Sequence, residues 1–376
     1  MNEPLNLATL GGLGWTPALQ QAWAQRAPDT EPGPAPTPMR VAEVHRDRLQ
    51  LHDGLVEHPA RVRSALLTEL AAQADALAVG DWVLATRNTL GEWWVAQRLP
   101  PRTQLARRLH DGRDKVERVV IASNIDTALL VMGLDHDFNL RRLERYLALV
   151  RLAGVGAVVV LTKADLCDQP AQRLAQVQAM VPPDVGVVAL NALAEEPAPS
   201  LAPWLQPGQT LVLLGSSGVG KSTLTNALLG QAVQATGGNR HGDGRGRHTT
   251  TTRSLHRTAS GACIVDTPGL RTLRLDSEAG DIAGVFGEVA RLAPACRFRN
   301  CRHQGEPGCA VREAVPAERL DSFHKLQREA QRDSLSALQK KALVSQWKAR
   351  GRATRQHLKA KRGEGGEGGG GPRGDA

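Results

Sequence analysis

The spacing of apolar and polar residues divides the chain into regions of different secondary structure. Between Arg40 and Leu105, five runs of strand length are bounded by Gly, Asp or Asn, which favour turns. Five short strands in succession predict a small β-barrel, and an OB-fold is the natural candidate. A barrel without a ligand of its own fits the pattern equally well. The five runs are RVAEVH, RLQLHDG, EHPARV, GDWVLATR and GEWWVAQRL.

From about Val119 the pattern changes to apolar strands that alternate with helical stretches. Helices are predicted from Leu140 to Leu152, near Ala171–Met180 and from Lys221 onward. The strands between them, such as TALLVM, AVVVL, TLVLL and ACIVD, are apolar along almost their whole length. This alternation predicts a parallel sheet covered on both faces, whose ligands lie at the carboxyl ends of the strands.

Length and composition suggest how these regions form domains, since 376 residues are enough for two or three. Residues 28–38 are rich in proline and are interpreted as a linker, and the Gly-rich end is expected to be disordered. The predicted segments are an N-terminal extension with its linker (1–38), an OB-fold domain (39–108), an α/β domain (119–275), a mostly helical domain ending in a basic helix (280–362) and a tail (363–376).

The formal net charge of +9 suggests a polyanionic partner, although many basic proteins merely carry solvated Lys and Arg. Most of the excess positive charge follows Lys325. No apolar run is long enough to span a membrane, and the N-terminus lacks the pattern of a secretory signal. We therefore expect a cytoplasmic protein that does not bind a membrane, with a monomer as the default.

The most specific motif is GSSGVGKST, which fits G-x-x-x-x-G-K-[ST] and lies between a predicted strand and a predicted helix. Its glycines let the backbone wrap around phosphates, whose charge the N–H groups and the helix N-terminus stabilise. Lys221 is expected to reach the β- and γ-phosphates, and the Ser222 hydroxyl to ligate Mg²⁺. The predicted nucleotide-binding residues here are Gly215, Ser216, Ser217, Gly218, Val219, Gly220, Lys221, Ser222 and Thr223.

A second motif, Thr162-Lys163-Ala164-Asp165, directly follows the strand AVVVL and is similar to the N/T-K-x-D motif of GTPases. An aspartate here can accept hydrogen bonds from the guanine N1 and 2-amino groups, which adenine lacks, so the site would reject adenine strongly. The stem of the lysine would pack over the base. Taken alone, the same residues could simply begin a helix after a strand.

A weaker candidate for base contact is the pair Asn191 and Ala192, which follows the strand VGVVAL. Their backbone N–H groups would contact the guanine O6. An ordinary turn explains these two residues equally well.

The third motif, Asp266-Thr-Pro-Gly269, ends the strand ACIVD and fits D-x-x-G. Asp266 is expected to hold Mg²⁺ through water, and the Gly269 N–H to sense the γ-phosphate. A threonine in the preceding stretch GRHTTTTR, either Thr250 or Thr251, is expected to complete the Mg²⁺ shell in the GTP state. An ordinary turn after a strand is the alternative for D-x-x-G alone.

The order of these motifs differs from that of ordinary GTPases, in which the glycine-rich loop comes first and K-x-D comes late. Here Asp165 precedes Gly215, so the sequence predicts a circularly permuted P-loop GTPase domain. The segment after D-x-x-G then leads directly into the C-terminal domain, and hydrolysis could swing that domain.

A fourth motif, Cys296-x4-Cys301-x-His303-x5-Cys309, brings three thiols and an imidazole close together in the sequence. These are the four ligands that a structural Zn²⁺ site requires, with no position left open for catalysis. Buried free thiols are the alternative. An odd total of five cysteines argues against a disulfide framework.

Together these residues resemble the ribosome small-subunit-dependent GTPase A family, the circularly permuted GTPases of bacterial small-subunit biogenesis. The resemblance covers roughly Arg40 to Ser334 and also rests on Asn124-Ile-Asp126, DFNLRRLERYL and CRFRNCRHQGEPGCAV. It implies an OB-fold domain, a permuted GTPase domain and a C-terminal zinc-binding domain. It also implies hydrolysis of GTP to GDP and phosphate, stimulated by the small ribosomal subunit, late in that subunit's maturation. The barrel face and the basic C-terminal helix would contact rRNA.

Two positions depart from GTPases in general. Thr162 stands where many have Asn, which we expect to weaken the tie between this loop and the glycine-rich loop. Leu270 stands where Ras-like enzymes place a water-orienting Gln, and the family likewise carries an apolar residue there. The resemblance implies that the histidine of the threonine motif, His248, takes the place of this Gln, so His248 is a hypothetical catalytic residue, and a phosphate or rRNA contact is its alternative. The alternative function is a GTP-dependent RNA-binding switch acting on another RNA or subunit.

Overall fold

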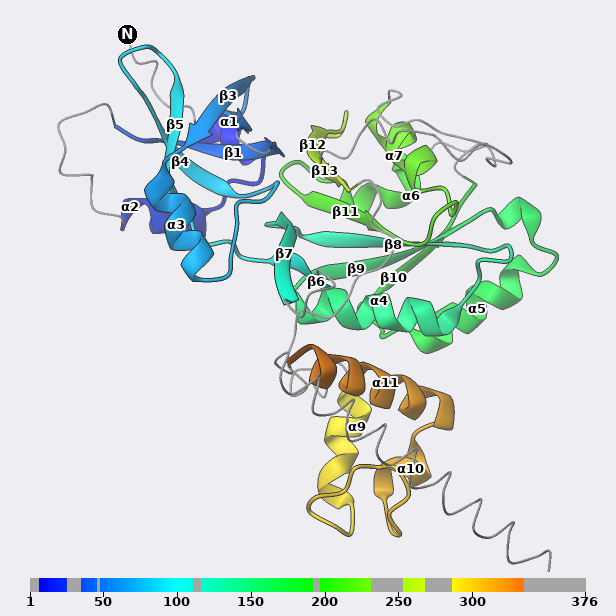
Figure 1. The fold of residues 1–376 in the computed structure, drawn as a ribbon. Coiled ribbons are helices and arrows are strands. Elements are labelled where there is room, and N and C mark those ends of the chain that lie inside the picture. Colours follow the sequence, from blue (N-terminus) through cyan, green and yellow to red (C-terminus); the bar gives the residue numbers. More distant parts are fainter. Residues whose placement is uncertain are drawn as a thin grey trace, which may run out of the picture.

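The computed structural model consists of a β-barrel, an α/β part and a helical C-terminal module (Figure 1). The structure describes residues 7–25, 35–45, 48–110, 116–191, 197–230, 253–267 and 286–334. Five predicted site residues, Ala192, His248, Thr250, Thr251 and Gly269, lie outside these ranges, as do the predicted basic helix beyond residue 334 and the tail. Among the described helices, none is both long and apolar enough to cross a membrane.

The barrel contains the five strands that the sequence predicts. They are β1 (Thr37–Val44), β2 (Leu49–His52), β3 (Glu57–Val62), β4 (Trp82–Arg87) and β5 (Trp93–Arg98). Their order is β1-β2-β3-β5-β4, and pairing of β1 with β4 closes the barrel. The barrel also contains a helix that was not predicted, α3 (Ser64–Ala72), whose Leu66 and Leu70 pack into the barrel core. The closed five-stranded barrel confirms the predicted OB-fold.

The α/β part is a six-stranded sheet in the order β10-β9-β8-β11-β13-β12. The first five strands are parallel, and β12 is antiparallel to β13. The strands are β8 (Thr127–Gly133), β9 (Gly156–Thr162), β10 (Gly186–Ala189), β11 (Thr210–Leu214), β12 (Ser254–Arg257) and β13 (Cys263–Asp266). β11 lies between β8, which precedes it in the chain, and β13, which follows it. This arrangement confirms the permuted order, and the point between β8 and β11 is where such sheets bind ligands.

Alternate residues of the parallel strands pack into two separate cores. One core includes Leu130 and Val159 and is covered by α4 (Leu140–Leu152) and α5 (Pro170–Met180). The other includes Leu129 and Val158 and is covered by α6 (Ala198–Leu201) and α7 (Lys221–Leu229). Figure 1 shows these two helical layers on opposite faces of the sheet. Burial on both faces explains why the strands are apolar at nearly every position.

The barrel and the sheet are connected by elements that the sequence analysis did not anticipate. The strands β6 (Gln104–His110) and β7 (Val116–Ser123) form a separate two-stranded ribbon. Arg118 on β7 binds Asp75 of the barrel at 3.3 Å, and Asp75 also binds Arg98 at 2.5 Å. One backbone pairing, between Glu43 of β1 and Ser254 of β12, joins the barrel directly to the sheet.

The N-terminal segment packs where the barrel and the sheet meet. It contains α1 (Leu7–Gly11) and α2 (Pro17–Ala24), and Trp15 between them packs edge-on against Trp82 at 4.8 Å. Arg40 of β1 is only 1% exposed. Its guanidinium donates to Leu13 O of this segment, to Gly80 O, to Asn124 O at 3.1 Å and to Thr210 Oγ1 at 2.9 Å. One buried cation therefore joins the N-terminal segment, the barrel and the sheet.

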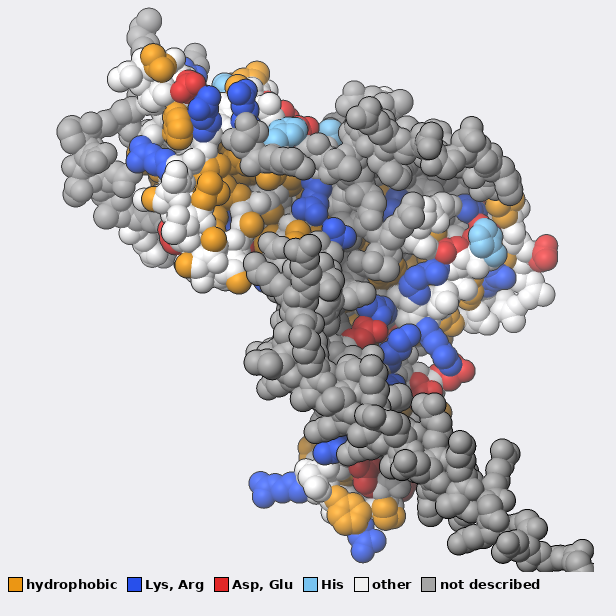
Figure 2. Space-filling model, in the orientation of Figure 1, with side chains coloured by type: hydrophobic (Ala, Val, Ile, Leu, Met, Phe, Trp, Pro, Cys, Tyr) orange, Lys and Arg blue, Asp and Glu red, His pale blue; other side chains and the backbone are white. Residues whose placement is uncertain are grey.

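The C-terminal module consists of α9 (Gly287–Leu292), α10 (Ala310–Ala314) and α11 (Ala317–Ser334). It contacts the α/β part through α4. Arg319 of α11 binds both Glu144 of α4 and Glu288 of α9, and Arg145 of α4 binds Glu329 at 2.8 Å. Figure 2 shows acidic and basic side chains next to one another in this region. Buried apolar residues of α4, such as Leu143, also share one core with Leu320 and Phe323 of α11, so the module is held to α4 by both ion pairs and apolar packing.

Candidate functional site

The glycine-rich loop (Gly215–Thr223) connects β11 to α7 at the carboxyl edge of the sheet. Gly215, Gly218 and Gly220 have φ values of +156°, +80° and +96°, where side chains are unfavourable. A Cβ on Gly215 would lie 2.3 Å from Val131 O of the neighbouring strand. These backbone conformations explain why the motif requires glycine, and they bring the chain to the start of α7.

Lys221 lies across the mouth of this loop. Its Nζ donates to Gly215 O at 2.9 Å and to Ser216 O at 2.5 Å. Ser222 and Thr223 follow in the first turn of α7. The loop therefore presents an ammonium group and a helix N-terminus together, an arrangement that stabilises a bound phosphate chain.

The TKAD loop (Thr162–Asp165) follows β9, two strands away from β11. Thr162 is 2% exposed, and its Oγ1 donates to Val219 O of the glycine-rich loop at 2.7 Å. Lys163 has a left-handed φ of +57°, and Asp165 lies in the short helix η1 (Ala164–Leu166). We expected a threonine at this position to weaken the contact between the two loops, but its hydroxyl forms a hydrogen bond that joins them. The structure brings the two predicted nucleotide motifs together.

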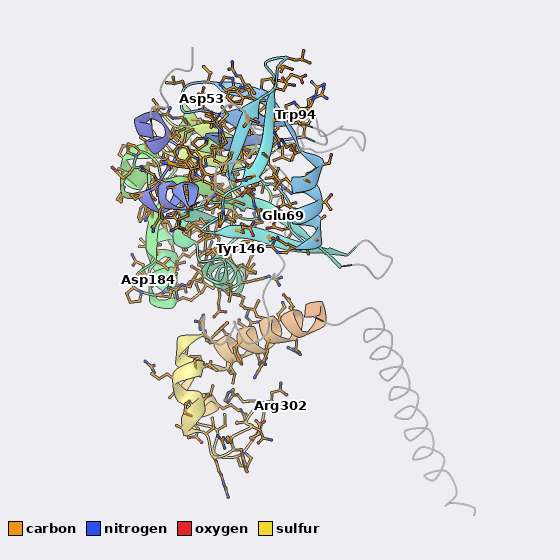
Figure 3. All side chains as sticks on the ribbon, turned by 90° about the vertical axis from the view of Figure 1, so that its left-hand side faces the viewer. Asp53, Glu69, Trp94, Tyr146, Asp184 and Arg302 are labelled. Carbon is orange, nitrogen blue, oxygen red and sulfur yellow. The ribbon has the colours of Figure 1, made fainter. Side chains whose placement is uncertain are left out.

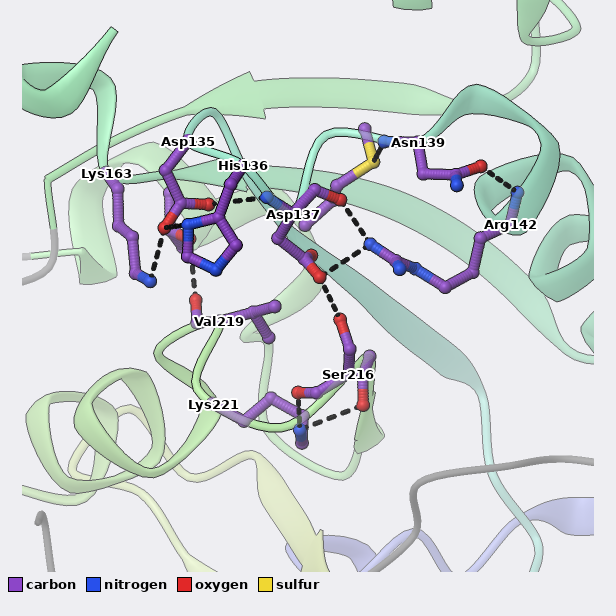
Figure 4. A network of polar contacts seen from close by, with 12 residues as sticks. Asp135, His136, Asp137, Asn139, Arg142, Lys163, Ser216, Val219 and Lys221 are labelled. Atoms are coloured by element: carbon purple, nitrogen blue, oxygen red, sulfur yellow. Dashed lines mark hydrogen bonds and ion pairs between the residues drawn. The ribbon is translucent and has the colours of Figure 1, made fainter. Parts of the chain in front are cut away.

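A loop that was not predicted to belong to the site joins these two motifs. It runs from Leu134 to Asn139, between β8 and α4, and we call it the acidic loop. Asp135 Oδ2 binds Lys163 Nζ at 2.8 Å, and Asp137 Oδ1 accepts a hydrogen bond from Ser216 Oγ at 2.5 Å (Figure 4). The available signal was a pair of carboxylates directly after a buried strand, at the edge where ligands bind.

The environment of Asp135 favours its ionised form. Burial acts to raise the pKa of Asp135, but the hydrogen bond from Lys163 and the backbone N–H of Asp137 hold it below its usual value. Arg173 of α5 lies over Phe138 at 4.9 Å and donates to Asp135 O at 3.1 Å. The acidic loop is therefore held by Lys163 at the Asp135 side chain and by Arg173 at the Asp135 backbone.

Asp266 ends β13, on the other side of β11. Because β11 and β13 are parallel, with Val212 opposite Val265, Asp266 lies at the same edge of the sheet as Gly215. Asn191 follows β10 at this edge, and Ala192 lies outside the described residues. The described candidates from four strands, β9, β10, β11 and β13, thus occupy one edge.

The four residues of the Cys/His motif form a compact cluster in the C-terminal module. The ligand atoms of Cys296, Cys301, His303 and Cys309 all lie within 4.8 Å of one another. His303 Nδ1 lies 3.3 Å from Cys309 Sγ, and the Sγ atoms of Cys296 and Cys309 are 3.9 Å apart. Two thiolates bound to one tetrahedral Zn²⁺ would be roughly 3.8 Å apart. The donor set can therefore hold a metal ion.

Backbone N–H groups shape the chain around this cluster. The N–H of Val311 points at Cys296 and lowers the pKa of that thiol, whereas burial raises the pKa of Cys301 to about 11. The N–H groups of Arg302, Gly305 and Gln304 surround the Glu306 carboxylate and lower its pKa to about 2. Glu306 thereby stabilises the turn between His303 and Cys309.

Comparisons with known proteins identify similar sequences and folds. A family profile described as RsgA GTPase matches residues 99–276. The protein named small ribosomal subunit biogenesis GTPase RsgA of Xylella fastidiosa (strain M23) is 46% identical over 286 residues, which are 76% of this chain and 83% of that protein.

Two solved structures share the fold. YjeQ from Thermotoga maritima has a TM-score of 0.58 and 23% identity, covering 78% of this chain and 98% of that chain. YloQ, described as a circularly permuted GTPase, has a TM-score of 0.57 and 21% identity, covering 80% of this chain and 96% of that chain.

Proposed function

The chain belongs to the RsgA GTPase family, and we propose that this GTP-hydrolysing enzyme acts on the small ribosomal subunit, late in its maturation. We further propose that binding to the subunit stimulates hydrolysis of GTP to GDP and phosphate. The observation that supports a guanine-nucleotide site most directly is the Thr162–Val219 hydrogen bond, which places the TKAD loop against the glycine-rich loop. One nucleotide can then contact both loops through its base and its phosphates.

In this proposal each motif binds one part of GTP. Asp165 accepts hydrogen bonds from the guanine edge, and the backbone of Gly215–Thr223 holds the phosphates with Lys221 beside them. Ser222, Asp266 and either Thr250 or Thr251 would hold Mg²⁺, which neutralises negative charge on the phosphates when it is bound with GTP. The Gly269 N–H would contact the γ-phosphate.

His248 remains a hypothetical catalytic residue that positions the attacking water. The hypothesis predicts that His248→Ala loses turnover in the presence of the partner while it still binds GTP. Full subunit-stimulated turnover of the variant would refute it.

We propose one structural Zn²⁺ at Cys296, Cys301, His303 and Cys309. Four protein ligands complete a tetrahedral shell, so this ion would hold the module together and have no position for a substrate. Its role would be to stabilise the turns that connect α9, α10 and α11.

Contact with rRNA is proposed for the barrel and the basic C-terminal region. On the barrel, Arg87 lies over Trp93 at 4.6 Å and Arg61 over Trp94 at 5.8 Å. Indole and guanidinium planes of this kind stack well on unpaired bases. Figure 3 shows Trp94 on the barrel and Arg302 on the C-terminal module, at opposite ends of the molecule. The protein is proposed to act as a cytoplasmic monomer.

The test is GTP hydrolysis by the purified protein alone, with small subunits and with large subunits, using ATP as a control. Stimulation by small subunits alone would support the proposal. Stimulation by large subunits or by another RNA would favour the alternative, a switch acting on a different partner. Asp165→Asn should relax the preference for guanine, and unchanged specificity would contradict the role of that residue.

A further inference from the structure

The acidic loop contacts both nucleotide motifs, although none of its residues belongs to them. We propose that Asp135 and Asp137 are positioning residues for the nucleotide. Asp135 orients the guanine-binding side through Lys163, and Asp137 orients the phosphate-binding side through Ser216. This inference rests on the proposed guanine-nucleotide site, and it adds two residues that act on that site without contacting the nucleotide.

On the phosphate side, contacts with Arg142 fix the position of Asp137 independently of its hydrogen bond with Ser216. Arg142, in the first turn of α4, binds Asp137 Oδ1 at 2.7 Å and also donates to Asp137 O. Asn139 Oδ1 in turn accepts from the Arg142 N–H at 3.0 Å, which caps the helix. The Asp137 side chain is only 13% exposed. Its carboxylate is thus a fixed acceptor for the Ser216 hydroxyl at 2.5 Å.

Ser216 transmits this constraint to the phosphate-binding backbone. Its hydroxyl is bound by Asp137, while its carbonyl accepts from Lys221 Nζ at 2.5 Å (Figure 4). Both ends of the residue are therefore held, which fixes the peptide planes next to it. When the backbone N–H groups of the loop are already oriented, phosphate binds without a loss of conformational entropy in the loop.

On the base side, Asp135 holds the end of Lys163. The 2.8 Å ion pair ties the ammonium group down, so the aliphatic stem is kept in one conformation. The Asp135 side chain is 10% exposed, and its Oδ1 accepts from the Asp137 N–H at 3.0 Å. This hydrogen bond couples the two carboxylates within one turn of the chain. A stem held in this way offers a preformed surface for the guanine ring.

The two roles predict different dependence on the number of phosphates. We would measure the affinities of the full-length protein for GMP, GDP and GTP by competition with a fluorescent GDP. Asp137→Ala and Ser216→Ala should each weaken GDP and GTP binding about tenfold and GMP binding less than about twofold. Asp135→Ala should weaken all three nucleotides by a similar factor, about fivefold, because the base is common to them.

A double variant separates a positioning role from a general effect on folding. Because Asp137 acts through Ser216, Asp137→Ala combined with Ser216→Ala should bind no more weakly than the weaker single variant. If Asp137→Ala unfolds the protein, Asp137→Asn retains the side-chain volume and should weaken GDP and GTP about threefold. Asp184→Asn is the matched control, since Asp184 forms an exposed ion pair with Arg151 and should leave all affinities unchanged.

Several outcomes would overturn the inference. Tighter GTP binding by Asp137→Ala would show that Asp137 acts only as a negative charge near the phosphates. Additive losses in the double variant, or equal losses for GMP and GTP, would also refute the phosphate-side role. Failure of the proposed site itself is distinguishable, because then Lys221→Ala would bind GTP as well as the unmodified protein does.

Discussion

Thr162→Val is the sharpest perturbation of the site, because it removes one hydroxyl and retains the shape of the side chain. In the structure this hydroxyl donates to Val219 O at 2.7 Å in a buried position. Leaving a buried acceptor without its donor costs about 1–3 kcal/mol. The unfolding free energy should therefore fall by about 1–2 kcal/mol.

The same hydrogen bond holds the TKAD loop and the glycine-rich loop at the separation that one nucleotide has to bridge. Without it, part of the binding free energy is used to bring the loops together. A loss of about 1.4 kcal/mol corresponds to about a tenfold weaker affinity for GDP. Stopped-flow binding of a fluorescent GDP measures this change, and chemical unfolding measures stability in parallel.

Thr103→Val provides a closely matched control. The Thr103 hydroxyl also donates to a buried carbonyl, that of Ile125, at 2.8 Å. It lies near the beginning of the parallel strands, whereas Thr162 ends β9, so about 20 Å separates the two along the sheet. Both variants should lose similar stability, and only Thr162→Val should lose affinity. Unchanged GDP affinity in Thr162→Val, within about twofold, would refute the reasoning.

Three further predictions concern regions outside the nucleotide loops. Arg40→Met leaves four buried acceptors without their cation and should lower the unfolding free energy, measured with urea, by about 3–5 kcal/mol. Arg40→Lys should restore only part of this stability. A loss below about 1 kcal/mol for Arg40→Met would contradict the prediction. Burial raises the pKa of Asp81 from 3.8 to about 6, so the protonated form is favoured on folding and stability falls as pH rises through this range. The unfolding free energy of Asp81→Asn, relative to that of the unmodified protein, should accordingly grow by on the order of 3 kcal/mol between pH 4 and pH 7 and then stay constant. Parallel pH profiles of stability for the two proteins would rule this out. Removal of the metal by a chelator, or Cys301→Ser, should reduce the helical circular dichroism of the C-terminal module and leave GDP affinity unchanged; retained helicity in both cases would argue against a structural metal.

Sequence reasoning failed mainly where a residue's role depends on a distant partner. Asp137 begins the stretch DFNLRRLERYL and Asp135 precedes it by two residues, but nothing local indicated that their partners are Ser216 and Lys163. Arg40 likewise was only the first residue of the predicted strand RVAEVH. The structure shows it 1% exposed among acceptors from three parts of the chain.

Short elements held by tertiary packing were also missed. The segment of α3, SALLTELAA, is rich in the helix formers Ala, Leu and Glu and carries Leu66 and Leu70 one turn apart, so a helical signal was present and was overlooked. The ribbon of β6 and β7 spans the boundary between the two patterns, from Leu105 to Val119, for which no element was predicted.

The sequence by itself determined the fold class, the permuted order of the nucleotide motifs and the four residues of the cluster that can hold a metal ion. Each of these depends on local information, namely the periodicity of apolar residues within one element or the spacing of residues within one loop. Only the tertiary structure decided which loops meet at the edge of the sheet, which cation joins the N-terminal segment to the barrel, and how α11 binds α4. These contacts join residues far apart in the chain, and the positions of the strands and helices that carry them are set by packing of the whole molecule.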